Sequence, residues 1–195
     1  FDQVIPYSAN HTIAAWIKMD ASESGAIFTW GSPTTNNYTS FLVQSGRIRY
    51  ISGNGNPSPP NVAGSTFIGD NQWHHVAVTR NAAGDINLYL NGNPEASGNL
   101  SLHVNNPTQA SIGGGLFNGS YQQNLDCDMD EFTYWTEELT AEEIQSIICS
   151  GPQGSDVFID FESGAGTAVV EDASGNGNSA ALFNMDANAD WVDFG

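Results

Sequence analysis

The chain has 195 residues, and its 22 Asp and Glu residues against 4 Lys and Arg residues give a formal net charge of −18. So few cationic side chains argue against binding to nucleic acid or to an anionic membrane surface, whereas divalent cations would be attracted. No run of about 18 apolar residues is present, which argues against insertion into a membrane.

Short apolar stretches rich in β-branched and aromatic residues alternate with clusters of Gly, Asn and Pro along most of the chain. The turn residues between these stretches predict antiparallel hairpins rather than helical crossovers. The sequence therefore predicts an all-β fold of two antiparallel sheets packed as a sandwich. The clearest predicted strands are 11–19, 25–30, 40–44, 47–51, 74–80 and 85–92.

One short helix is predicted near 140–149, within LTAEEIQSIICSG. Thr140 is the expected N-cap, Glu143 completes a capping box, and Gly151 follows the last turn. Beyond the helix, DVFIDF at 156–161 resumes a strand-like pattern. There is no linker composition at this point, so a single domain over 1–195 is the simpler prediction.

The only two cysteines are Cys127 and Cys149. An acidic chain rich in Asn, Gly, Ser and Thr favours a secreted or cell-surface location, where a Cys127–Cys149 disulfide would persist. The alternative is two separate buried thiols, because free cysteine is among the most buried residue types.

The stretch DCDMDEF at 126–132 places Asp126, Asp128 and Asp130 at alternate positions. In a strand these three carboxylates would share one face, and their mutual repulsion would raise their pKa values. Three explanations are open: catalysis by paired acids, a bound cation, or exposure to water.

Four segments carry a family resemblance, and their order along the chain makes the combination specific. They are TIAAWIK (12–18), QWHHVAVTRNAAGDINLYLNG (72–92), MDEFTYW with TAEEI (129–144), and the pair FESGAG (161–166) and DASGNGN (172–178). Together they resemble the laminin-G-like branch of the concanavalin A-like lectin and glucanase superfamily. The resemblance implies a jelly-roll β-sandwich.

The last two segments depart from the family order, in which they precede the TIAAWIK strand. Two interpretations follow: residues 156–195 complete this sandwich, or they begin a following repeat. We expect the first, because an isolated strand pair of that length would be marginally stable.

The resemblance also bears on catalysis. Glucanases of this superfamily use a Glu-x-Asp-x-Glu-like motif on a central strand, whereas DCDMDEF has Asp at both catalytic positions and matches the last strand before the helix. A motif needs its structural context, so catalysis by these acids is not expected.

The resemblance favours a structural Ca²⁺ instead. In many relatives the Asp that matches Asp130 helps to hold this ion together with the opening strand, which corresponds here to the region of Asp160. Asp172 and Asn176 add the oxygen-rich turn that calcium loops need, with an ordinary Asx turn as the alternative. A bulge near Glu131 would re-aim Asp130.

A ligand would meet aromatic rings, which stack on sugars, and amides, which satisfy hydroxyl groups. Three other tryptophans, Trp16, Trp73 and Trp135, fall within the family's packing motifs and are assigned to the core. The candidate ligand-binding residues are Trp30, Asn36, Asn37, Tyr38, Tyr50, Phe117, Asn118, Tyr121 and Gln122.

These features predict a non-catalytic, extracellular recognition module that is stabilised by calcium and binds a carbohydrate or cell-surface glycan. Its expected setting is a larger adhesin or carbohydrate-active protein. The alternatives are a protein-binding or spacer module of an adhesion array and, third, a glucan hydrolase. The fold by itself cannot choose between them.

Overall fold

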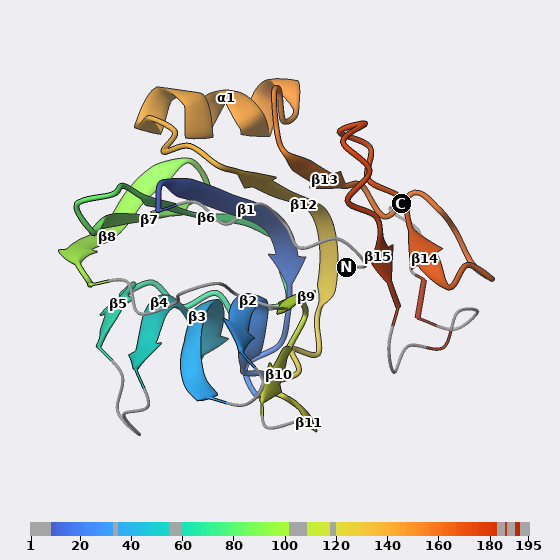
Figure 1. Ribbon diagram of the computed structural model, residues 1–195, viewed down its shortest axis with the longest axis horizontal. Helices are drawn as coiled ribbons and strands as arrows, with labels where there is room; N and C mark the ends of the chain where they lie inside the picture. The colour runs from blue at the N-terminus through green and yellow to red at the C-terminus, as the bar shows by residue number, and fades with distance from the viewer. Residues whose placement is uncertain are drawn as a thin grey trace.

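The computed structural model describes residues 9–32, 35–54, 60–101, 109–117, 120–182, 186, 190 and 191, and only the backbone of 32, 35–37, 54, 109, 116–117 and 120–122. Two antiparallel sheets pack face to face, and a helix lies on the outer side of one of them (Figure 1). This arrangement confirms the all-β sandwich predicted from the sequence.

Six strands form the sheet that lies between the helix and the second sheet. Each pair of neighbours in it is antiparallel. In spatial order the strands are β13 (Val157–Ile159), β12 (Asp128–Trp135), β1 (His11–Lys18), β6 (His74–Arg80), β7 (Asp85–Leu90) and β8 (Asn93–Asn99).

The facing sheet has five strands, and two short hairpins stand beside the sandwich. In spatial order the five strands are β5 (Asn61–Ala63), β4 (Arg47–Asn54), β3 (Thr35–Gln44), β2 (Gly25–Ser32) and β9 (Gln109–Ile112). The hairpins pair β10 (Gly115–Phe117) with β11 (Ser120–Gln122), and β14 (Val169–Val170) with β15 (Ala180–Ala181).

The core between the two sheets follows the alternation of side chains along each strand. Aromatic rings fill one part of it: the ring centroids of Phe28 and Trp30 are 4.6 Å apart, and those of Phe28 and Phe132 are 5.2 Å apart. Trp30 and Tyr50 have no exposed surface. Their assignment to a ligand site was therefore wrong, because both rings point into the core.

The helix α1 (Ala141–Ser150) begins with the predicted capping box between Thr140 and Glu143 and is followed by Gly151 with φ 72°. It covers the outer face of the six-stranded sheet (Figure 1). Trp135 is buried there rather than between the sheets, and its indole donates to Gln153 O at 3.1 Å. In the part of the chain that the structure describes, no helix is long and apolar enough to span a membrane.

The segment after the helix joins the same sandwich. Strand β13 pairs with β12, with Ile159 opposite Phe132 and Val157 opposite Tyr134. Val157 and Ile159 are fully buried in the core between the sheets, and Val170 of β14 belongs to the same cluster. Residues 157–159 are thus an edge strand of this sheet.

We expect Ile159→Ala to lower the free energy of unfolding by about 3 kcal/mol, because it leaves a cavity in a packed core. The matched control is Phe158→Ala, since the neighbouring ring is partly exposed on the opposite face, and its cost should be less than half as large. Urea unfolding followed by tryptophan fluorescence measures both. An Ile159→Ala variant as stable as the wild type would mean that residues 156–195 do not belong to this domain.

Candidate functional site

A β-bulge follows the alternating acids of DCDMDEF. Asp128 lies opposite Lys18 and Asp130 opposite Trp16, but the register then shifts before Ala14. Glu131 absorbs the extra residue with φ 48°, a left-handed value that is uncommon for a residue other than glycine. The predicted bulge is therefore confirmed. Phe132 enters the core as a result, whereas Asp128 and Asp130, which precede the bulge in regular register, stay on the outer face of the sheet.

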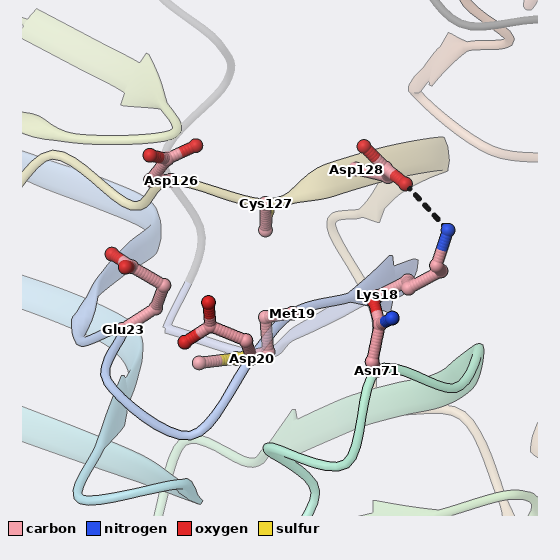
Figure 2. Close-up of a pocket in the computed structure, with 8 residues that line it drawn as sticks. All are labelled: Lys18, Met19, Asp20, Glu23, Asn71, Asp126, Cys127 and Asp128. Atoms are coloured by element: carbon pink, nitrogen blue, oxygen red, sulfur yellow. Dashed lines mark hydrogen bonds and ion pairs between the residues drawn. The ribbon is translucent and has the colours of Figure 1, made fainter.

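Asp126 and Asp128 border an acidic pocket of about 180 Å³ at one end of the sandwich (Figure 2). The pocket lies between the start of β12, the loop after β1 and the loop before β6. Lys18 Nζ lies 3.0 Å from Asp128 Oδ2, and both side chains are about one third exposed. The lining residues are Lys18, Met19, Asp20, Glu23, Asn71, Asp126, Cys127 and Asp128.

The Cys127 thiol in this pocket is unreactive at neutral pH. The pKa of Cys127 is raised to about 12, chiefly by burial, and the negative charges of Asp128, Asp126 and Glu23 act in the same direction. At neutral pH the sulfur is therefore protonated, and a protonated thiol is neither a nucleophile nor a metal ligand. Cys149 lies exposed in the last turn of α1, and both thiols are free. The predicted disulfide was wrong.

Asp130 and Glu131 form a second group of acids, at the bulge itself. The pKa of Asp130 is raised, first by burial and then by the negative charges of Glu162 and Asp160, although a hydrogen bond from Glu131 N opposes the shift. The pKa of Glu131 is raised by burial and by Asp130, and a hydrogen bond from Trp16 opposes this. Asp130 and Asp160, two of the four predicted calcium ligands, are thus neighbours.

The other two predicted ligands, Asp172 and Asn176, organise a loop. Asp172 Oδ1 accepts hydrogen bonds from the backbone N–H of Phe158 (2.9 Å) and of Ser174 (3.0 Å), which is the Asx turn named as the alternative. The Asn176 amide donates to the carbonyl oxygens of Ser155 and Asp156. The loop that DASGNGN forms is thereby fastened to the start of β13.

The electrostatics of Asp172 agree with this structural role. Burial by itself would raise its pKa, but the hydrogen bonds from Ser174, Phe158 and Asn178 outweigh burial and lower it. A carboxylate surrounded by N–H donors offers little to a cation. Among the side chains that the structure describes, no group of three or more His, Cys, Asp or Glu residues is placed to hold a metal ion. The predicted four-residue calcium set is therefore not assembled.

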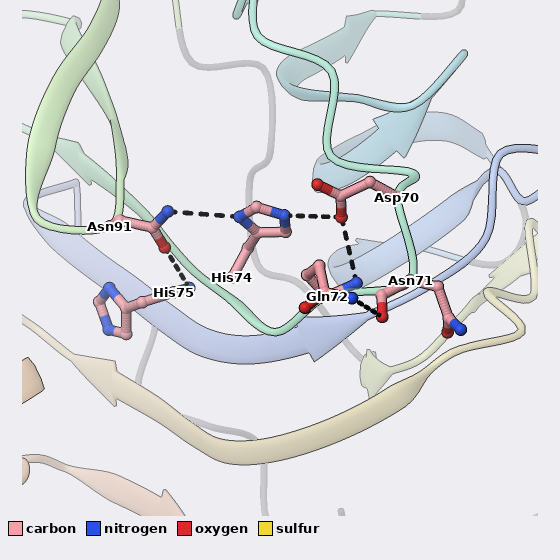
Figure 3. A network of polar contacts seen from close by, with 6 residues as sticks. All are labelled: Asp70, Asn71, Gln72, His74, His75 and Asn91. Atoms are coloured by element: carbon pink, nitrogen blue, oxygen red, sulfur yellow. Dashed lines mark hydrogen bonds and ion pairs between the residues drawn. The ribbon is translucent and has the colours of Figure 1, made fainter.

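A polar network lies next to the pocket, and Asn71 belongs to both (Figure 3). Asn91 Oδ1 accepts a hydrogen bond from His75 N at 2.9 Å, which fixes the orientation of the amide. Asn91 Nδ2 then donates to His74 Nδ1 at 3.3 Å, so that His74 Nε2–H donates to Asp70 at 2.9 Å. This hydrogen bond from His74 lowers the pKa of Asp70. The network joins the loop before β6 to the β7–β8 turn.

The neighbouring His75 faces the outer side of the six-stranded sheet, where its ring meets Trp16 edge-on at 5.4 Å. It is 2% exposed, and its buried Nδ1 has no hydrogen-bond partner within the described ranges. Burial lowers the pKa of His75 to about 4. The imidazole is therefore neutral at physiological pH and unsuited to bind a proton there.

We expect this histidine to make the protein less stable as the pH falls from about 6.5 to 4. In the unfolded chain His75 binds a proton near pH 6.5, whereas the folded state binds it only near pH 4, so protonation favours unfolding in this window. The loss should approach about 3 kcal/mol. Urea unfolding of the wild type and of His75→Phe at several pH values gives the free energy of unfolding as a function of pH. The contribution of His75 is the difference between the two pH dependences. Parallel pH dependences would disprove it.

The outer face of the five-stranded sheet is the last candidate region. Side chains that alternate with the core residues of β2, β3 and β4 gather on it. Three of them, Ala26, Leu42 and Ile51, form a separate apolar cluster with Tyr38 packed against it. Beside this cluster, Thr29 Oγ1 and Ser40 Oγ lie 2.9 Å apart. Both hydroxyl groups are buried and hydrogen-bonded to each other, so this part of the face is closely packed.

Two larger side chains of this face reach solvent. Tyr38 and Arg49 are partly exposed, and burial raises the pKa of the Tyr38 phenol, which keeps it protonated. Tyr38 was predicted from the sequence. Arg49 was not predicted from the sequence. The alternation in RIRYI (47–51) could have indicated it, because it places Arg49 on the opposite face of the strand from Ile48 and Tyr50.

The remaining predicted ligand residues cannot be placed by their side chains. Asn36 and Asn37 belong to β3, Phe117 to β10, and Tyr121 and Gln122 to β11, but only their backbone is described. Asn118 lies outside the described residues. Their role in ligand binding stays a prediction.

Comparison with known families agrees with this architecture. A laminin-G-type family model described as the concanavalin A-like lectin/glucanases superfamily matches residues 2–145. The chain therefore belongs to that superfamily. A comparison with curated proteins gives no match.

Solved structures with the same fold are distant in sequence. A candidate carbohydrate-binding protein from Bacteroides ovatus ATCC 8483 has a TM-score of 0.70 and 16% identity over 91% of this chain, which spans 53% of that longer chain. A heptameric SAP-like pentraxin from Limulus polyphemus has a TM-score of 0.59 and 22% identity, covering 77% of this chain and 75% of that one. The CBM40 domain of the Ruminococcus gnavus IT-sialidase, bound to α2,3-sialyllactose, has a TM-score of 0.60 and 12% identity, covering 72% and 83%.

Proposed function

We propose that this protein is a non-catalytic carbohydrate-recognition module whose ligand lies on the outer face of the five-stranded sheet. The observation that carries the proposal is the composition of that face. Tyr38 and Arg49 stand partly exposed beside the apolar cluster and supply a phenol and a guanidinium as hydrogen-bonding groups. An aromatic ring beside hydrogen-bonding groups suits a pyranose, which has both apolar and hydroxyl-bearing surfaces.

The comparisons support the same proposal. The matching superfamily includes lectins, and the neighbours in structure include a candidate carbohydrate-binding protein and a sialidase domain bound to a sugar. This chain spans only part of the Bacteroides protein. We therefore propose, as its setting, a larger secreted or cell-surface protein such as an adhesin or a carbohydrate-active enzyme.

A hydrolytic function has weaker support. Cys127 is protonated at neutral pH and His75 is buried and neutral, so neither is suited to nucleophilic or acid–base chemistry. Asp128 and Asp130 lie on the outer face of the six-stranded sheet, whereas the proposed ligand lies on the outer face of the other sheet. The proposal therefore assigns the acids to the surface and to the end pocket.

We expect the wild type to bind glycans on an array and Tyr38→Ala to lose about tenfold or more in affinity, because a stacking platform is removed. Phe67→Ala is the matched control, since Phe67 is 44% exposed and packs on Gly46 in the turn at the opposite end of β3. Equal losses in both variants would place the ligand elsewhere. Release of reducing ends from soluble β-glucan by the wild type would contradict the non-catalytic assignment.

We further propose that a structural Ca²⁺ lies near Asp130 and Asp160, with backbone carbonyl oxygens rather than a third carboxylate completing its coordination. The support is electrostatic: Glu162 and Asp160 both raise the pKa of Asp130, and a divalent cation would turn this repulsion into attraction.

If the ion binds the folded state alone, calcium at a hundredfold excess over Kd should raise the free energy of unfolding by about 3 kcal/mol. Thermal unfolding with calcium and with excess chelator, at fixed ionic strength, measures this. Asp130→Asn should abolish the difference, whereas Asp126→Asn, in the end pocket, should preserve it. An unchanged midpoint in chelator would remove calcium from the proposal.

A further inference from the structure

The four cationic side chains of this acidic protein differ in the partners that they have among the described residues. Lys18 pairs with Asp128. Arg47 donates to the carbonyl oxygens of Ser45 and Ser65. Arg80 is 2% exposed and donates to three backbone carbonyls. Arg49 makes no hydrogen bond or ion pair with any residue that the structure describes, and its Nε is buried.

An unpaired guanidinium is unexpected in a chain with 22 acidic residues. Burying part of a charged group without a partner is unfavourable, so buried charges are ordinarily paired. The cross-strand neighbours of Arg49 are Leu42 and Ala63, neither of which can accept a hydrogen bond through its side chain. Glu95 lies on β8, the edge strand of the other sheet, and its carboxylate accepts the N–H groups of Ser65 and Thr66.

The position of Arg49 on the sheet is fixed by its neighbours. Ile48 and Tyr50 point into the core, so Arg49 points to the outer face. Arg49 pairs with Leu42, and four residues further along β4 Gly53 pairs with Tyr38. A rise of about 3.3 Å per residue separates the guanidinium row from the phenol row by roughly 13 Å. Between them lies the row of Ile51, Ser40 and Thr29.

We propose that Arg49 binds the carboxylate of an acidic saccharide, a glycan that carries a uronate or a sialate, while another ring of the same glycan contacts Tyr38. The inference rests on the proposed carbohydrate-binding function and adds the class of ligand. The planar guanidinium presents paired N–H donors that match the two oxygens of a carboxylate. The apolar surroundings of Leu42 and Ile51 reduce competition from water for that contact.

The net charge of −18 does not forbid such a ligand. Charges more than about 8 Å apart are largely screened at physiological ionic strength, so the distant acids act weakly on the carboxylate at Arg49. They would instead disfavour ligands with many negative charges, such as nucleic acid. The expected ligand therefore carries one or few carboxylates on an otherwise neutral oligosaccharide.

Calorimetric titration with 3′-sialyllactose, with a glucuronate-terminated disaccharide and with lactose tests the proposal, and the two acidic sugars distinguish sialate from uronate. We expect the wild type to prefer an acidic sugar to lactose by at least tenfold. Arg49→Gln should remove this preference, and Arg49→Lys should restore part of it. Arg47→Gln is the matched control on the same strand and should behave as the wild type.

The measured affinities distinguish a failure of this inference from a failure of the proposed function. If the wild type binds lactose with the same affinity as both acidic sugars, and Arg49→Gln has no effect, the role of Arg49 is overturned. Carbohydrate recognition itself would still stand. To cover the case in which no sugar binds, the Arg49 Nε–H signal is followed by NMR during addition of sodium glucuronate. A shift of that signal supports the carboxylate site without a glycan, and its absence overturns both proposals.

Discussion

The six-stranded sheet has to satisfy packing on both of its faces, and the rest of the structure depends on this constraint. Along β1, Ile13 and Ile17 pack against the opposing sheet, while Ala14 lies beneath α1. A strand covered on both sides needs apolar residues at every position rather than at alternate ones. The run IAAWI at 13–17 meets that need. The small alanines also let the helix approach the sheet closely.

The bulge in β12 resolves a conflict within one strand. Its last residues must place Tyr134 in the core and Trp135 beneath α1, whereas its first residues carry carboxylates that must stay in contact with water. A regular strand would place Phe132 on the same face as Asp130. The extra residue at Glu131 changes the phase, so the ring enters the core and the acids stay outside. The cost is a left-handed backbone at one residue.

Most charged side chains of this protein lie away from the outer face of the five-stranded sheet. The carboxylates are spread over the end pocket, the loops and the outer side of α1, and three of the four cations are committed to Asp128 or to backbone carbonyls. The outer face of the five-stranded sheet is the exception, since it combines the Tyr38 phenol, an apolar cluster and Arg49, which has no partner among the described residues. That face can recognise a ligand by shape and hydrogen bonding without strong long-range attraction.

The sequence by itself determined the sandwich, the capped helix and the bulge near Glu131, because each depends on local alternation or on a cap within a few residues. The sequence also predicted that Trp30 and Tyr50 lie on strands. It did not show which face of β2 and β4 points into the core, because that depends on the packing of the second sheet against them. The same limit applies to the acids. Neighbouring positions in the sequence did not show that Asp130 would meet Asp160, or that Asp172 would be used by backbone N–H groups. Contacts between distant segments depend on how the two sheets and the segment after the helix pack, which local patterns do not encode. The same holds for Arg49, whose lack of a partner among the described residues follows from what packs around β4.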